Sequence, residues 1–296
     1  MEIRVLRYFL TVVQEQSITK AAEVLHITQP TLSRQLAQME DEIGVKLFDR
    51  GSRRITLTNE GLLLRRRAEE ILQLVDKTEK ELIEQDEQIE GKITVGCGEL
   101  GSVQLLPDLF ESFRKKYPLV TFDIYTATAD HVKEQMDRGL MDIGLLLEPI
   151  DIEKYDFIRL DMKEHWIVVM RPDCPLAERE YVTAKDLSDL PLIMPRRLKV
   201  QSELASWFGD YYDELNVLFT SNLNTNSAVM VSSGLGYSIV IEGMMPFWDQ
   251  SKITYRPLYP PLTATSVLAW KRGQPFSLAA TKFIEHIKCF LSMDKA

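Results

Sequence analysis

Three amphipathic segments that precede Gly44 constrain the fold of this chain more than any other feature. Residues 2–16 place apolar side chains at helical spacing, and a short second segment buries Ala21 and Ala22. A third segment starts near Thr28, with Pro30 in the first turn, where a missing N–H costs nothing. The buried stripe of this third helix consists of Leu32, Leu36, Met39 and Ile43. The pattern predicts two short helices joined by a tight turn and supported by a first helix.

Two short strands and a long helix are expected next. A basic turn lies between two short segments whose apolar residues are Val45, Leu47 and Phe48 and then Ile55 and Leu57, which is typical of a wing. From about Thr58 to Gln88 the chain is polar, with one seam at steps of four and three, and such a seam needs a partner. The seam consists of Leu64, Ala68, Ile71, Val75, Thr78, Leu82, Gln85 and Ile89.

After Gly91 the sequence alternates apolar strands with amphipathic helices, which indicates an α/β fold. The predicted strands are ITVGCG, TFDIYTA, DIGLLLE, HWIVVM, PLIMP, YSIVIEG and SVLAWK. We therefore expect an α/β multidomain protein with a helical N-terminal domain at 1–58, a linker helix for dimerisation at 59–90 and a further domain at 91–296. No uncharged apolar stretch is long enough to span a bilayer, so a cytoplasmic protein is expected.

The second and third helices fit the geometry of a helix-turn-helix, whose second helix enters the major groove of DNA. The third helix exposes Gln and Arg side chains, which can form paired hydrogen bonds with adenine and guanine edges. From periodicity alone, an ordinary helical hairpin with a solvated polar face remains equally open. Net charge does not decide between them: the chain carries −9 overall, but residues 1–57 carry +1, and the acidity lies in the remainder.

The run SITKAAEVLHITQPTLSRQLAQMEDEIGVKLFDRGSRRITLTNEG closely resembles the DNA-binding signature of the LysR-type transcriptional regulators. It shows the paired alanines, the QP that opens the recognition helix, the E-x-x-x-G-x-x-LF-x-R entry to the wing and the T-x-x-G start of the linker helix. Weaker motifs continue the resemblance over the rest of the chain, such as LLPDLFESFRKKYPLVTF and SSGLGYSIV.

The resemblance implies a winged helix-turn-helix that binds double-stranded promoter DNA as a homodimer or homotetramer, and contact with RNA polymerase. The wing reads DRGSRRI, where family members commonly carry a Thr-Gly or similar small pair after the arginine, so its minor-groove contact is less secure. Arg65, Arg66 and Arg67 point about 100° apart on a helix, and a mostly solvated role is expected for them. The implied DNA-binding residues are Gln29, Pro30, Thr31, Ser33, Arg34, Arg53 and Arg54.

For the C-terminal domain, the resemblance implies two α/β subdomains similar to the type 2 periplasmic binding proteins, with a small-molecule effector between them. Subdomain I would span 91–163 and 266–296, and subdomain II 164–265. Helix N-termini in such a cleft suit a small anion, whereas Glu99 would repel one unless Arg196 or Arg197 compensates, or unless the effector carries an ammonium group. The implied effector-binding residues are Gly98, Glu99, Ser102, Thr126, Thr128, Pro195, Arg196, Val200, Gln201, Asn224, Thr225 and Asn226.

Two other functions, those of a nicotinamide-dependent oxidoreductase and of a solute-binding protein, have less support in the sequence. Gly96, Gly98 and Gly101 spell the G-x-G-x-x-G of a dinucleotide-binding turn, but no acidic residue ends the next strand and Pro107 interrupts the helix. A solute-binding protein would lack the helix-turn-helix and would carry a signal peptide. No cofactor is expected, and neither the four histidines nor the three cysteines show metal-ligand spacing. The protein is therefore expected to be a regulator and not an enzyme; the sequence leaves open its effector, its target genes and whether it activates or represses.

Overall fold

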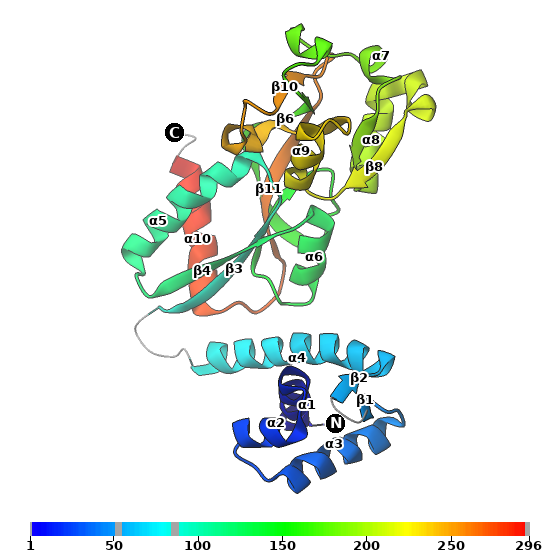
Figure 1. Cartoon of the computed structure of the whole chain (residues 1–296). Coiled ribbons are helices and arrows are strands. Elements are labelled where there is room, and N and C mark those ends of the chain that lie inside the picture. The colour runs from blue at the N-terminus through cyan, green and yellow to red at the C-terminus, as the bar shows by residue number, and fades with distance from the viewer. Residues whose placement is uncertain (1, 51–54, 84–88, 294–296) are drawn as a thin grey trace. The chain divides into compact units, whose positions relative to one another are not determined.

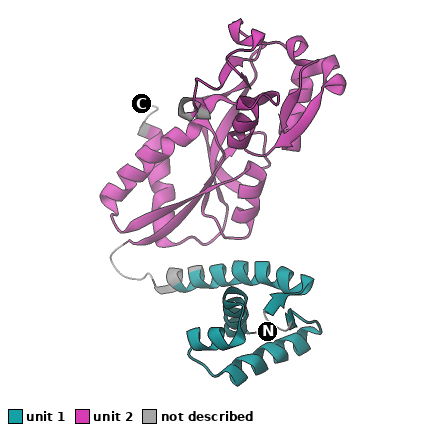
Figure 2. Ribbon diagram, in the orientation of Figure 1, with its two compact units in different colours: residues 1–85 teal, residues 86–296 magenta. Residues whose placement is uncertain are grey.

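The structure is a computed structural model that describes residues 2–50, 55–83 and 89–293 (Figure 1). The chain divides into two compact units, residues 1–85 and residues 86–296 (Figure 2). None of the described helices combines the length and the apolarity that crossing a membrane requires. Each unit has its own buried apolar core, so each is described by itself.

The described residues of the N-terminal unit form four helices and a two-stranded antiparallel sheet. Its elements are α1 (Ile3–Glu15), α2 (Ile18–Val24), α3 (Gln29–Ile43), β1 (Phe48–Arg50), β2 (Ile55–Leu57) and α4 (Asn59–Ile83). Ser17 caps α2 by accepting a hydrogen bond from the Lys20 N–H, and Gly44 ends α3 in the left-handed conformation. The three expected helices and both strands of the wing are present, although β1 begins three residues after Val45, at Phe48.

The core of this unit is formed by the buried stripe predicted for α3 together with apolar residues of the neighbouring elements. Leu32, Leu36 and Met39 are buried and pack in one cluster with Phe9 of α1. The fourth predicted member of the stripe, Ile43, is 42% exposed because it lies in the last turn of the helix. The polar side of α3 is therefore left for solvent or for a partner.

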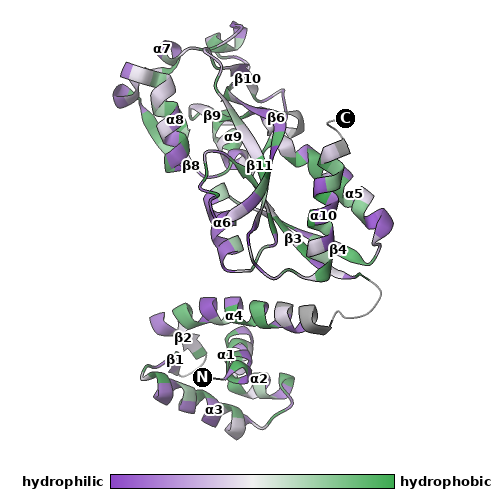
Figure 3. Cartoon of the chain, turned by 180° about the vertical axis from the view of Figure 1, so that it is seen from behind, coloured by the Kyte–Doolittle hydropathy of each residue, from purple (hydrophilic) through white to green (hydrophobic). Residues whose placement is uncertain are grey.

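Helix α4 has one face that packs within its own unit, which corrects the predicted seam. Ala68 is fully buried and Leu64 packs against the same core, so these two residues do not face a partner. In contrast, Ile71 and Leu74 are 37% and 43% exposed. Hydrophobic and hydrophilic residues alternate along this helix (Figure 3). Of the other predicted seam residues, Gln85 lies outside the described residues, and Ile89 packs on the core of the second unit.

The C-terminal unit is built on one mixed sheet, in the order β4-β3-β5-β11-β6-β9-β7-β8, with β10 paired to β6. Its strands are β3 (Gly91–Cys97), β4 (Val120–Thr126), β5 (Ile143–Leu147), β6 (Tyr155–Met170), β7 (Leu192–Pro195), β8 (Val217–Ser221), β9 (Tyr237–Ile241), β10 (Thr254–Pro257) and β11 (Thr263–Lys271). Its α-helices are α5 (Leu105–Lys116), α6 (Ala129–Asp137), α7 (Ala184–Leu187), α8 (Leu198–Phe208), α9 (Asn224–Ser232) and α10 (Leu278–Met293).

Two long strands connect the two halves of this sheet. The start of β6 pairs with β11 beside β5, and the end of β6 pairs with β9 and β10. We call β3, β4, β5, α5, α6 and α10 the first half, and β7, β8, β9, β10, α7, α8 and α9 the second half. In the first half, α5 and α10 lie side by side on one face of the sheet and α6 covers the other (Figure 1). The halves therefore meet where β6 and β11 pass from one to the other.

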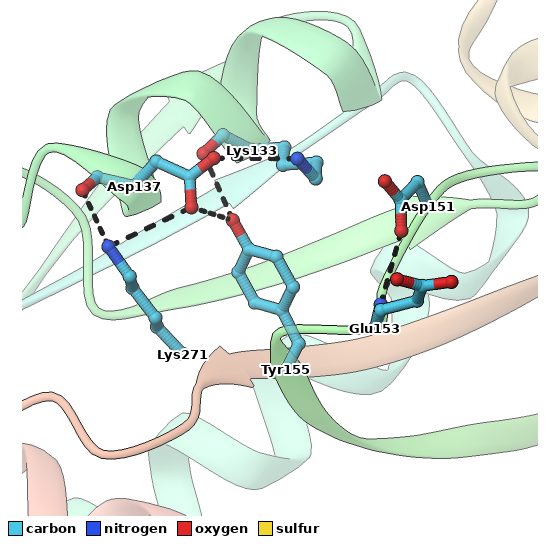
Figure 4. Close-up of polar contacts among 6 residues, drawn as sticks. All are labelled: Lys133, Asp137, Asp151, Glu153, Tyr155 and Lys271. Carbon is cyan, nitrogen blue, oxygen red and sulfur yellow. Dashed lines mark hydrogen bonds and ion pairs between the residues drawn. The ribbon is translucent and has the colours of Figure 1, made fainter.

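A polar cluster joins α6 to the sheet (Figure 4). The buried Tyr155 hydroxyl donates to the Asp137 carboxylate over 2.6 Å, and the Lys271 ammonium donates to the Asp137 carbonyl over 2.7 Å. Burial alone would raise the pKa of Asp137, but the hydrogen bond from Tyr155 and the charges of Lys133 and Lys271 outweigh it, so this pKa is lowered. Burial and the neighbouring carboxylate also raise the pKa of Tyr155.

Replacing Tyr155 by Phe is expected to cost about 1 kcal/mol of unfolding free energy at pH 7, since Asp137 is partly solvated and the lost bond is screened. A carboxyl whose folded-state pKa is lowered contributes stability above its unfolded pKa of about 4, and this contribution is lost as the pH falls further. The difference between parent and Tyr155→Phe should therefore shrink below about pH 4.

Urea unfolding of the parent and of Tyr155→Phe at pH 7 and at pH 3.5 measures this difference in unfolding free energy. The matched control is Tyr211→Phe, at an exposed tyrosine. A penalty that is equal at pH 7 and pH 3.5 (about half a unit below the unfolded carboxyl pKa) would show that Asp137 is not the partner that matters.

Candidate DNA interface and ligand cleft

The first candidate site is the exposed side of α3, which follows α2 after a sharp turn. His26 adopts the left-handed conformation in this turn, with φ of 52°. Thr28 precedes the helix, and its hydroxyl lies 2.8 Å from the hydroxyl of Thr31. Of the predicted DNA-binding residues on α3, Gln29, Pro30 and Arg34 are exposed, whereas Thr31 and Ser33 are half-buried.

Arg34 is separated on the helix from the buried Leu32 and Leu36, so its guanidinium can reach a partner outside the unit. A guanidinium can donate two parallel hydrogen bonds to a guanine edge. The other two predicted DNA-binding residues, Arg53 and Arg54, lie outside the described residues.

Glu40 fixes the entry to the wing, a role that the sequence motif did not reveal. Its carboxylate is buried and accepts hydrogen bonds from the N–H groups of Leu47 and Phe48, over 2.8 and 3.3 Å, and from the ammonium of Lys46, over 3.1 Å. Burial raises the pKa of Glu40, but these donors lower it by more, so the net shift is downward. The glutamate in the E-x-x-x-G pattern is therefore a structural anchor of β1.

The T-x-x-G pattern at the start of α4 also has a packing explanation. Thr58 donates its hydroxyl proton to the Lys46 carbonyl over 2.7 Å, and the same oxygen accepts from the Gly61 N–H over 3.0 Å. A Cβ at Gly61 would lie only 2.1 Å from the Leu47 carbonyl oxygen. Only glycine therefore allows α4 to approach the wing this closely.

The second candidate site is a cleft between the two halves of the C-terminal unit, which encloses about 690 Å³ including space open to solvent. Seven of the twelve predicted effector-binding residues line it: Gly98, Glu99, Thr128, Pro195, Arg196, Val200 and Asn224. Much of the remaining wall is apolar and comes from Leu100, Ala127, Leu147, Trp166, Met194, Ile239, Val240 and Ile241. Its size and its mixture of apolar walls with a few polar groups suit a small molecule.

The other five predicted residues lie outside this lining. Ser102 is fully buried, and its N–H donates to Glu164 over 2.9 Å. Thr126, Thr225 and Asn226 are exposed, and the Gln201 amide donates to the Pro195 carbonyl over 2.8 Å. Asn224, Thr225 and Asn226 form the first turn of α9 instead of preceding it.

An ion pair and a set of hydrogen bonds to a carboxylate cross the cleft, and the sequence predicted neither. Arg197 of the second half pairs with Asp130 of the first half over 2.8 Å, and it donates to the carbonyls of Leu147 and Pro149 over 2.9 and 2.5 Å. Glu99 of the first half accepts hydrogen bonds at the start of α9 from the N–H groups of Asn224 and Thr225 and from the Thr225 hydroxyl.

A further carboxyl, that of Glu203 on α8, has a raised pKa. Its burial and the negative charge of Glu148 raise this pKa, and together they outweigh the charge of Arg197, which lowers it.

The glycine-rich turn is explained by packing. A Cβ at Gly96 would lie 2.2 Å from the Met141 sulfur. The N–H groups of Gly101 and Ser102, where a nucleotide phosphate would bind, both donate to the buried Glu164 carboxylate over 2.9 Å. A phosphate would have to displace this carboxylate, which argues against a dinucleotide site. The described residues also hold no group of three or more His, Cys, Asp or Glu side chains arranged to bind a metal ion.

Two family models match the chain. Residues 3–62 match the bacterial regulatory helix-turn-helix protein of the lysR family, and residues 86–292 match the LysR substrate binding domain. Together they cover both candidate sites.

Among curated proteins, BsdA of Bacillus subtilis, an HTH-type transcriptional regulator, is 30% identical over 96% of this chain and 99% of its own length. The hca operon transcriptional activator HcaR of Escherichia coli is 28% identical over 93% of each chain. Among solved structures, full-length CbnR complexed with its target DNA has a TM-score of 0.72 at 21% identity, over 97% of this chain and 99% of that one.

Proposed function

Because the chain belongs to the LysR family of bacterial transcriptional regulators, we propose that a small-molecule effector binds in the cleft of its C-terminal unit and thereby changes how a dimer or tetramer sits on DNA. The coarser function follows directly from the two domain matches: the protein is a DNA-binding transcription regulator with a substrate-binding domain. Its relatives are regulators and not enzymes. As a regulator of bacterial promoters it would act in the cytoplasm, where it would also contact RNA polymerase.

The single observation that carries the proposal is the matched pair of sites. An exposed polar face on α3 lies in a unit that matches the lysR helix-turn-helix, and a cleft lined by the starts of α6, α8 and α9 lies in a unit that matches the substrate-binding domain. We propose that Gln29, Thr31, Ser33 and Arg34 read bases or phosphates, and that Thr128, Arg196 and Asn224 contact the effector. We also propose the domain limits 1–58, 59–90 and 91–296.

Selection of bound duplexes from a randomised pool, with the full-length protein, tests the DNA-binding part of the proposal. A dimer with two-fold symmetry should enrich partly palindromic sequences, whose half-sites are separated by whole helical turns. Enrichment of no common sequence would contradict it. The effector class can be found by a thermal-shift screen of small anions and amino acids, since a ligand that binds only the folded state raises the unfolding temperature.

Replacing Thr128 by Val is expected to lower effector affinity about 5- to 150-fold, which corresponds to the 1–3 kcal/mol cost of an unmet hydrogen bond. Thr128 lines the cleft at the start of α6, and the substitution keeps the side-chain volume. Affinity for DNA without effector should not change. Calorimetric titration with the compound found in the screen measures the effect, with Thr126→Val, two residues away and outside the cleft lining, as the control. Equal affinities of Thr128→Val and the parent would remove Thr128 from the site.

A further inference from the structure

Glu99 connects the two halves of the cleft through the start of α9. It lies in the loop between β3 and the 3-10 turn Gly101–Gln104, both in the first half, whereas α9 belongs to the second half. Its carboxylate accepts hydrogen bonds from the N–H of Asn224, from the N–H of Thr225 over 3.1 Å and from the Thr225 hydroxyl. The Asn224 side-chain amide also donates to the Glu99 carbonyl over 3.3 Å. One residue thus makes four contacts across the cleft.

The start of α9 needs an acceptor that its own sequence does not provide. The residue before the helix is Leu223, whose side chain cannot accept a hydrogen bond, and no side chain caps the helix locally. The first N–H groups of a helix have no partner within the helix, and the helix dipole adds partial positive charge at this end. The carboxylate of Glu99 therefore occupies the position that an anion would take at the start of α9.

The two arginines of the cleft differ in whether their guanidinium groups can still bind a ligand. The Arg197 guanidinium is 8% exposed and is already bound to Asp130 and to two backbone carbonyls. Arg196 also lines the cleft but is exposed, and among the described residues its guanidinium has no acidic partner within 4.0 Å. Of these two cationic groups, Arg196 is the one that can still pair with an anionic group of a ligand.

We propose that Glu99 determines which effectors the cleft accepts: its carboxylate serves as a built-in anion at the start of α9 and excludes an effector's anionic group from that position. The cleft then takes an apolar molecule with no more than one anionic group, placed beside Arg196, and rejects a molecule that carries an anion at each end. This inference rests on the proposed function, because it assumes that the effector binds in this cleft.

Removing the Glu99 carboxylate should open an anion site that a small free carboxylate can fill. The experiment compares thermal unfolding of the full-length parent and Glu99→Ala in sodium acetate and in sodium chloride at equal ionic strength. In chloride, Glu99→Ala should unfold on the order of 5 °C below the parent, because the N–H groups at the start of α9 lose the carboxylate that accepts their hydrogen bonds. In acetate, at least half of this loss should be recovered, a gain larger than any that acetate gives the parent through Arg196.

Glu153→Ala is the matched control, since it removes an exposed glutamate of the same half at a place remote from α9 in the chain. It should respond to acetate as the parent does. Should Glu99→Ala fail to fold in chloride, its refolding yield in the two salts gives the same comparison, with folded protein expected only in acetate. The proposal is overturned if acetate recovers neither stability nor folding of Glu99→Ala, or if it stabilises the parent or Glu153→Ala equally.

The experiment contains neither DNA nor effector, so its result does not depend on the proposed function. Failure of the latter would appear as no enriched DNA sequence, or as equal effector affinities of Thr128→Val and the parent. Failure of the inference would appear only in the response of Glu99→Ala to acetate.

Discussion

Replacing Leu74 by Glu is expected to convert a dimer of this protein into a monomer and to lower its DNA affinity about 100-fold or more, because two half-site contacts are then no longer linked. Ile71, Leu74 and Thr78 recur at steps of three and four on α4 and are exposed within the unit. The exposed apolar pair of Ile71 and Leu74 is typical of a helix that packs against a second copy. A charge placed there would be buried without a partner on dimerisation, which costs about 3–5 kcal/mol.

The design separates loss of the dimer from loss of the fold. Leu74 is 43% exposed in the single chain, so its replacement leaves the core of the N-terminal unit intact. Gln73→Glu introduces the same charge on the neighbouring exposed position, about 100° around the helix, and should remain dimeric. Sedimentation velocity at micromolar concentration measures the mass of each variant. A monomeric parent, or a dimeric Leu74→Glu, would contradict dimerisation through α4.

Replacing Arg34 by Ala is expected to weaken binding to the selected DNA about 5- to 150-fold, as the loss of one bidentate guanine contact costs about 1–3 kcal/mol. The preference for one base pair in each half-site should relax, and binding to scrambled DNA should change much less. If the guanidinium instead contacts a phosphate, all sequences weaken alike and the salt dependence flattens by about one unit of slope.

Arg114→Ala on α5 serves as the control, because it removes the same charge from an exposed position of the other unit. Circular dichroism of Arg34→Ala should match the parent, since the side chain is exposed. Unchanged binding of Arg34→Ala to both selected and scrambled DNA would exclude α3 as the helix that reads DNA.

Elements with a local signal could be predicted from the sequence. The N-terminal helices carry apolar stripes and punctuating residues such as Ser17, Thr28 and Gly44, and their limits agree with the structure within about two residues. The buried strand β5 is apolar throughout, as DIGLLLE indicated. Local pattern sufficed because each of these segments carries its own apolar stripe, terminating residue or continuous apolar run.

Strands that lack an apolar run were missed. The strand β6 begins at Tyr155, ten residues before the HWIVVM that marked it, because charged residues interrupt the apolar ones in its first part, which is mostly exposed. The strand β8 lies at the edge of the sheet with Val217 and Leu218 exposed, and β10 has only four residues. Their pairing is decided by the neighbouring strands, which no local pattern records.

The prediction of the cleft is limited in the same way, because contacts between segments that are distant in the sequence leave no local pattern. Residues at the starts of helices, such as Thr128 and Asn224, could be proposed because the resemblance to the LysR-type regulators implies a ligand cleft at these positions. The pairs that cross the cleft could not: Arg197 and Asp130 are 67 positions apart, and Thr225 and Glu99 are 126 apart. The sequence identified Glu99 as a residue that would repel an anionic effector, and the structure shows that its carboxylate accepts hydrogen bonds at the start of α9.

The central claim, sequence-specific DNA binding by the full-length protein, is tested most directly by titrating the selected duplex and a scrambled duplex of equal length at several salt concentrations. The account predicts that the selected duplex binds about 1,000-fold or more tightly at physiological salt, and that both affinities fall as salt rises. Equal affinities for the two duplexes at every salt concentration would contradict it.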